Sequence, residues 1–206
     1  MTPFIAFLLA ATVLAITPGP GIAYVVARTV AGGRSEGIAS CVGTAFGGMV
    51  HVLAAALGLT ALLAQSAVAF SVVKYLGAAY LIYMGVRLLL SKSVATATPE
   101  VRASGVARAL RDGALVEAMN VKTAIFFLAF LPQFVVASEP VMPQIVLMGT
   151  MCVVLNTLVD VVAVFAASLL LKSSTARAAR EKMLTRVSGV TMIGLGVYLA
   201  AAKRSS

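Results

Sequence analysis

Long runs of apolar residues dominate this sequence, and they restrict its fold more than any other feature. Six runs come close to the roughly 20 residues that a helix needs to cross a bilayer. Of the 206 residues, 61% are hydrophobic and only 11% are charged, whereas about 25% are charged in an ordinary soluble domain. We therefore predict an all-α integral membrane protein. The six predicted transmembrane helices cover roughly residues 3–27, 37–64, 67–90, 114–137, 144–171 and 187–202.

The basic residues predict how these spans are oriented. Twelve of the 16 Lys and Arg residues fall in the first, third and fifth connections between spans. Because short loops rich in Lys and Arg stay in the cytoplasm, we expect both termini outside. The net charge of +9 favours contact with anionic membrane lipid at the cytoplasmic surface. The twelve residues are Arg28, Arg34, Arg87, Lys92, Arg102, Arg108, Arg111, Lys172, Arg177, Arg180, Lys182 and Arg186.

Several classes of function are disfavoured by the same sequence. Aromatic residues are not interleaved with the basic ones, which argues against nucleic-acid binding. We expect no metal site and no cofactor, because no His, Cys and Asp cluster has ligand spacing and no phosphate-binding loop is present. The stretch Gly33–Gly37 matches a hydrolase motif, but that motif needs a strand before it. We therefore expect no enzyme activity.

A weak internal repeat suggests two halves. The third predicted span contains LIYMGVRL from Leu81, and the sixth contains MIGLGVYL from Met192. Two halves of three spans each have opposite orientations in the membrane, and transporters use such inverted repeats around a central binding site. We predict one transmembrane transporter domain over residues 1–206, with halves at roughly 1–95 and 110–206. The alternative is that apolar helices simply look alike.

The first predicted span contains two prolines and two glycines within five residues. Pro18 and Pro20 cannot donate backbone hydrogen bonds, so two carbonyls of the preceding turn lose their helical partners. Unpaired backbone groups are tolerated at membrane depth only against protein or a wet cavity. Free carbonyls attract an ammonium, and a new helix start attracts a carboxylate, so an amino acid fits both. The predicted substrate site is Thr17, Pro18, Gly19, Pro20 and Gly21; a simple kink is the alternative.

The fifth predicted span carries Cys152, Asn156 and Asp160 on one helix face. An aspartate at the centre of a span is costly and is a functional candidate. We predict that Asp160 binds a coupling proton or pairs with Lys122. For Lys122 itself, a head group at the cytoplasmic interface is the alternative. Asn156 and Asn120 complete the predicted substrate site.

A stripe of small residues marks the second predicted span. Ala39, Gly43, Gly47, His51 and Ala55 follow one another at intervals of four and share one face. Small residues let neighbouring helices approach closely, so this face is predicted to pack against another helix. His51 should therefore point into the bundle. It is either a proton or substrate contact or a buried histidine that hydrogen-bonds across helices.

These motifs together resemble the LysE/RhtB family of amino-acid exporters, over nearly the whole chain. The matching features are Pro18-Gly19-Pro20, the glycine stripe of the second span, Lys74 with the stretch Tyr75–Leu90, the stretch Asn120–Phe134, and Asp160. This family usually has Asn-Pro-Lys in the fourth span, where this chain has Asn120-Val121-Lys122. The substitution leaves open whether the fourth span is also broken.

The resemblance implies a multi-pass exporter in the bacterial inner membrane, driven by the proton motive force. It suggests the branch that exports homoserine, threonine and leucine, so small amino acids and protons are the expected partners. Two alternatives stay open at this point, namely a divalent-metal exporter of the same superfamily and a membrane subunit that transports nothing. The sequence also leaves open whether the chain works alone or as a homodimer.

Overall fold

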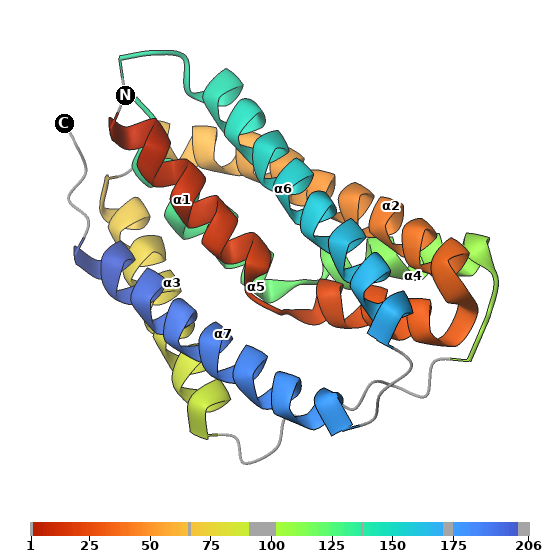
Figure 1. The fold of residues 1–206 in the computed structure, drawn as a ribbon. Helices are drawn as coiled ribbons and strands as arrows, with labels where there is room; N and C mark the ends of the chain where they lie inside the picture. Colours follow the sequence, from red (N-terminus) through yellow and green to blue (C-terminus); the bar gives the residue numbers. More distant parts are fainter. Residues whose placement is uncertain (1, 66, 91–101, 137, 171–174, 202–206) are drawn as a thin grey trace.

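The computed structural model describes all residues except 1, 66, 91–101, 137, 171–174 and 202–206. The secondary-structure elements of the described residues are all helical, and short non-helical segments join them (Figure 1). This confirms the predicted all-α class. The predicted end of the first half at residue 95 lies outside the described residues, as do Lys92 and Lys172. The helices are α1 (Thr2–Ile16), α2 (Pro20–Gln65), α3 (Ala67–Leu90), α4 (Val106–Ala118), α5 (Val121–Ile125), the π-helical turn η1 (Phe126–Phe130), the 3₁₀ turn η2 (Leu131–Phe134), α6 (Val141–Leu170) and α7 (Thr175–Ala201).

Part of the predicted membrane topology is visible in the lengths of these helices. Among the described residues, Pro20–Leu59 and Val141–Ser168 are long and apolar enough to cross a membrane. Val106–Ala118 and Val121–Phe134, bent by 44°, make a third crossing if they count as one span. The helix α1 and the last turns of α7 are apolar but shorter. The number of six spans therefore stays a prediction.

The boundary expected between the first two spans is corrected by the structure. The chain breaks at residues 17–19 and then continues as α2 through a bend to Gln65. The bend lies at Gly33, whose φ of 76° and ψ of −171° are not helical. A positive φ is available to glycine without steric cost. The predicted loop between residues 27 and 37 is thus a one-residue bend between two helical arms.

Close packing against α4 explains the small residues of α2, which packs mainly on α4 and α6 (Figure 1). A Cβ atom added to Gly43 would collide with the backbone carbonyl of Leu110, and one added to Gly47 would collide with that of Ala114. Only glycine allows two helix backbones to approach this closely. The predicted packing stripe is confirmed.

A second glycine contact joins α3 to α7, which lie side by side away from α2 and α4 (Figure 1). A Cβ on Gly85 would lie 2.6 Å from the carbonyl oxygen of Gly189, and one on Gly196 would lie 2.8 Å from that of Ala78. The two helices run antiparallel, because the later residue of α3 meets the earlier residue of α7. The repeated segments found in the sequence therefore pack on each other.

Between these two groups of helices lies an apolar core rich in phenylalanine. Phe126, Phe127 and Phe130 are almost fully buried in it. Pro132 cannot donate to the helix and clashes with the preceding turn, and the turn before it widens so that the amide of Leu131 bonds the carbonyl of Phe126. This π-helical turn places Phe126, Phe127 and Phe130 in the core.

Candidate functional site

A second helix break opposes the first one. The helix α4 ends at Ala118, and Asn120 has an extended conformation before α5 starts. The side-chain oxygen of Asn120 caps α5 by accepting from the amide of Lys122 at 3.1 Å. The first amide of a helix has no helical partner in any case, so Val121 can occupy the position that proline favours. The fourth predicted span is broken without a proline.

The ammonium of Lys122 closes the carbonyl end of the first break. Its Nζ donates to the carbonyl oxygens of Leu14 at 3.3 Å and Thr17 at 2.8 Å. These carbonyls lie at the negative end of α1, where a cation is favourable. Lys122 is 9% exposed, so its head group is inside the protein and the interfacial placement considered from the sequence is wrong. A Cβ on Gly19 would lie 3.0 Å from this Nζ atom.

At the other side of the first break, a carboxylate lies against the start of α2. A Cβ added to Gly21 would lie 2.6 Å from Oε2 of Glu117. Oε2 accepts from Nδ2 of Asn120 at 2.9 Å, and Oε1 accepts from the hydroxyl of Thr123 at 2.6 Å. Glu117 is 6% exposed. A carboxylate is favourable at the positive end of a helix, so both ends of the first break face a charge from the second.

The two breaks enclose a small polar cavity of about 20 Å³, which is room for one or two water molecules. Its apolar wall includes Phe127 and Val153. Backbone or side chains of ten other residues give the cavity its polar character. These residues are Gly19, Gly21, Thr44, Glu117, Asn120, Lys122, Thr123, Asn156, Thr157 and Asp160.

Asp160 reaches the cavity from the middle of α6. It is 5% exposed, and its Oδ2 accepts from the hydroxyl of Thr44 at 2.9 Å. No ion pair within 4.0 Å joins it to Lys122, although both residues line the cavity. The predicted pairing is wrong in this conformation, because the ammonium is held by carbonyls of the first break. Asn156, one turn earlier on α6, lines the same cavity.

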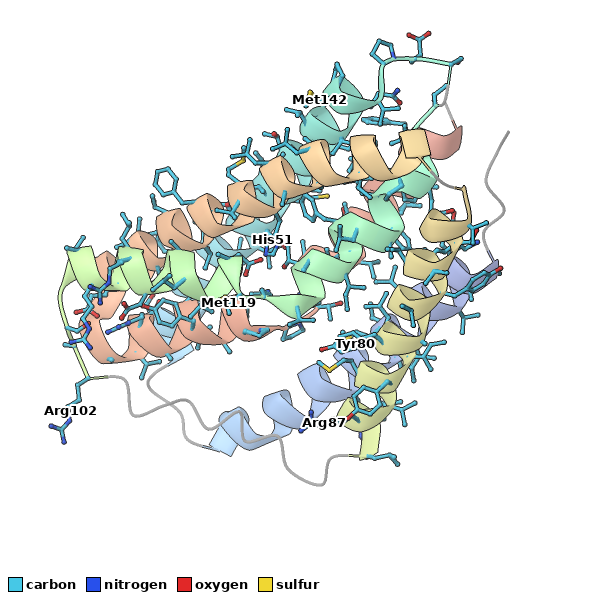
Figure 2. The ribbon with its side chains drawn as sticks, turned by 180° about the vertical axis from the view of Figure 1, so that it is seen from behind. His51, Tyr80, Arg87, Arg102, Met119 and Met142 are labelled. Atoms are coloured by element: carbon cyan, nitrogen blue, oxygen red, sulfur yellow. The ribbon has the colours of Figure 1, made fainter. Side chains whose placement is uncertain are left out.

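His51 lies beside the end of α4 rather than in the cavity lining (Figure 2). Its Nε2 atom is 2.8 Å from the carbonyl oxygen of Glu117. Because a carbonyl only accepts, the histidine is the donor. This is the hydrogen bond across helices that the sequence offered as the structural alternative. Within the first break, Thr17, Pro18 and Pro20 are also absent from the lining, which Gly19 and Gly21 reach.

Four lining residues with polar side chains were not assigned to the site from the sequence. Glu117 lay near the start of the predicted fourth span, where a charge commonly contacts the membrane surface. Its position one turn before Asn120 and Lys122 was the available signal, because residues three apart share a helix face. Thr44, Thr123 and Thr157 gave no signal, since threonine is common in membrane helices and bonds backbone carbonyls there, as Thr157 does with Val153.

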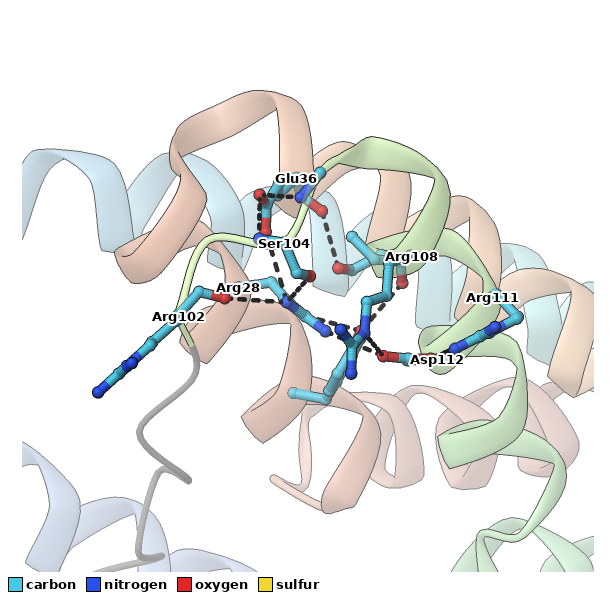
Figure 3. Close-up of polar contacts among 11 residues, drawn as sticks. Arg28, Glu36, Arg102, Ser104, Arg108, Arg111 and Asp112 are labelled. Atoms are coloured by element: carbon cyan, nitrogen blue, oxygen red, sulfur yellow. Dashed lines mark hydrogen bonds and ion pairs between the residues drawn. The ribbon is translucent and has the colours of Figure 1, made fainter.

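A second charged cluster joins the basic connections at one end of the molecule (Figure 3). Arg28 is 5% exposed and pairs with Asp112 at 3.0 Å and Glu36 at 3.6 Å. It also donates to the carbonyl of Arg102 and the hydroxyl of Ser104. Glu36 in turn accepts from the amides of Ser104 and Gly105. The bend of α2 is thereby tied to the start of α4.

The described residues contain no group of three or more His, Cys, Asp or Glu side chains that could hold a metal ion. An all-helical, membrane-type chain with charged residues around a cavity at two helix breaks has the features of a transporter. The family model described as LysE type translocator matches residues 12–203, and the chain belongs to this family. The family indicates a transporter rather than an enzyme.

Several known bacterial proteins are similar to this chain over most of its length. An uncharacterized membrane protein of Vibrio cholerae is 29% identical over 97% of both chains. The homoserine/homoserine lactone efflux protein of Salmonella typhimurium is 27% identical over 75% of each chain. The leucine efflux protein of Salmonella choleraesuis is 28% identical over 65% of this chain and 64% of its own. No solved structure matches the chain.

Proposed function

We propose that this protein exports small amino acids of the homoserine, threonine and leucine type across the bacterial inner membrane, driven by the proton motive force. The observation that carries the proposal is the cavity at the two opposed helix breaks, with buried charges of both signs around it. The efflux proteins named for homoserine and leucine support the substrate class.

The first break offers what an amino acid needs. The amides of Gly21 and Ile22 begin α2, line the cavity, and make no hydrogen bond within the described part of the chain. Such amides at a helix start bind a carboxylate. Asp160 and Glu117 supply negative charge for the ammonium group. Because the cavity has room only for water-sized occupants, it has to widen when a substrate enters.

One buried carboxylate is enough to couple export to the membrane potential. A proton that moves inward across about 150 mV supplies roughly 3.5 kcal/mol. At about 1.4 kcal/mol per tenfold ratio, this sustains a gradient of two to three decades. Asp160 is the proposed carrier of that proton, since it lies at the centre of α6 and contacts a neutral hydroxyl.

Two structural features support an inverted repeat with both termini outside. When the two repeats are aligned so that Gly85 matches Gly196, Ala78 matches Gly189. Under this alignment, the contact between Gly85 and Gly189 corresponds to the contact between Gly196 and Ala78, as expected for two related halves. Moreover, Arg28 and Arg102, from the first and third connections, meet in one cluster. This is the arrangement expected when both connections lie on the cytoplasmic side.

Efflux from reconstituted vesicles tests this function. Vesicles loaded with a panel of amino acids and divalent metals are placed in acidic medium, and loss of each compound is followed. We expect small amino acids to leave faster with the pH gradient than without it. Asp160→Asn should abolish the stimulation, whereas Glu139→Gln, an exposed carboxylate on a loop, should leave it unchanged. Loss of metals alone would indicate a metal exporter, and no loss at all would indicate a non-transporting subunit.

A further inference from the structure

The charges around the cavity do not cancel. Glu117 and Asp160 are both at least nine-tenths buried and line it, as does Lys122. Two carboxylates and one ammonium leave one negative charge in excess when all three are ionised. Such a charge is costly away from water unless a cation accompanies it.

Neither carboxylate has a cation of its own. Within the part of the chain that the structure describes, the ion pairs join only Arg28, Arg108 and Arg111 to Glu36 and Asp112. Glu117 accepts hydrogen bonds from neutral amide and hydroxyl groups, and Asp160 accepts one from a hydroxyl. Lys122 donates to two backbone carbonyls instead. Among the described residues, the two carboxylates of the cavity therefore have hydrogen-bond donors but no ion-pair partner within 4.0 Å.

We propose that Glu117 and Asp160 form one cation site, which holds either the ammonium group of the transported amino acid or a proton, but not both at once. This inference rests on the proposed function and assigns the coupling to a pair of carboxylates. When an amino acid arrives, its ammonium takes the place of the proton, which leaves to water on the side where the site is open. Exchange of one for the other makes the protein an antiporter.

The groups that face the pair do not replace it. Lys122 on α5 is held by the first break, and His51 on α2 donates to the carbonyl of Glu117. Cys41 on α2, one turn from Thr44, is a buried free cysteine and supplies no cation. Glu117 also lies beside Gly21, where the substrate carboxylate would bind. A free carboxylate there repels that group unless the ammonium lies between them, so the pair selects compounds with both charges.

Calorimetry on the purified full-length protein tests the exchange. The probe is L-leucine or L-homoserine, whichever the vesicle assay shows to be exported, in buffers of differing ionisation enthalpy between about pH 5 and pH 8. We expect binding to release up to one proton per protein. The apparent Kd should rise about tenfold for each pH unit on the acid side, as linkage requires when one proton competes with one ligand. The N-acetyl derivative, which lacks the ammonium, should not bind.

Variants locate the exchanging groups. Glu117→Gln and Asp160→Asn should each weaken binding at least about tenfold and abolish both proton release and the pH dependence. Glu139→Gln should match the wild type, and a thermal melt confirms that each variant is folded. Amino-acid binding without proton release at any pH, or equal binding of the N-acetyl derivative, would refute the exchange while export remained established. Absence of both binding and export would instead refute the proposed function.

Discussion

Replacing one glycine of the α2–α4 contact provides a direct test of the architecture that positions the cavity. A Cβ on Gly47 would lie 2.8 Å from both the amide nitrogen of Ala118 and Cβ of Glu117. Both distances are shorter than those that real Cβ atoms make to their neighbours. The backbone of α4 cannot move aside as a flexible side chain can. Gly47→Ala should therefore push α4 and the Glu117 carboxylate away from α2.

Gly58 on the same helix is the matched control, because nothing lies within 4 Å of an added Cβ there. Ala in place of Gly favours a helix by about 1 kcal/mol at both positions. Overpacking costs a further 1–3 kcal/mol, roughly, at Gly47 alone. The two variants should thus differ by about 1–3 kcal/mol, with Gly58→Ala the more stable. For a chain of this size, the difference corresponds to melting temperatures about 2–12 °C apart.

The protein carries its own reporter for this measurement. Cys41 and Cys152 are free and buried, with exposed fractions of 1% and 3%. A thiol-reactive fluorophore therefore reports unfolding as the temperature rises. Substrate binding should also fall in Gly47→Ala and persist in Gly58→Ala. Equal melting temperatures for the two variants would show that α4 does not rest on Gly47, and the described packing would be refuted.

Three further outcomes follow from the two breaks and the basic connections. Pro18→Ala with Pro20→Ala should give a protein at least as heat-stable as wild type, since about 3 kcal/mol per proline opposes the helix, but amino-acid binding should be lost; normal binding would mean that the break is only a kink. Lys122→Met should lower stability by about 1–3 kcal/mol in a thermal melt, because it leaves the carbonyl of Thr17 without its donor; an unchanged melt would contradict this pairing. In a cysteine-free background, an impermeant thiol reagent outside intact cells should label Ser138→Cys but not Ala103→Cys, and the reverse result would invert the topology.

The fold follows from local patterns, and these are visible in the sequence. Apolar runs predicted the helices, and the TPGPG stretch predicted the first break because proline cannot donate to a helix. The stripe through Gly43 and Gly47 predicted a packing face but not its partner, since spacing along one helix says nothing about which helix approaches. The partner, α4, is defined only by the collision that a larger residue would cause with its backbone.

The site was harder to predict, because its charges interact across breaks rather than along helices. Asp160 was a candidate for its depth alone, and it does line the cavity. The partner of Lys122 was expected to be a carboxylate, yet backbone carbonyls of Leu14 and Thr17 hold it instead. The second break was left open because proline is absent there, whereas an asparagine cap suffices. A hydrogen-bonding side chain can cap a new helix at a break as proline does, but such a residue is harder to recognise in the sequence as the sign of a break.

The two breaks depend on each other, and this dependence explains how a membrane protein tolerates both. The first break exposes the carbonyl end of α1 and the amide end of α2, and each needs a charged or polar partner at membrane depth. Both charges come from the segment around the second break, Lys122 to the carbonyls and Glu117 beside the amides. An amino acid carries the same two charges on one small molecule. Under the proposed export function, a substrate that enters the cavity competes with the contacts between the two breaks, and we expect its binding energy to be coupled to the rearrangement of those contacts.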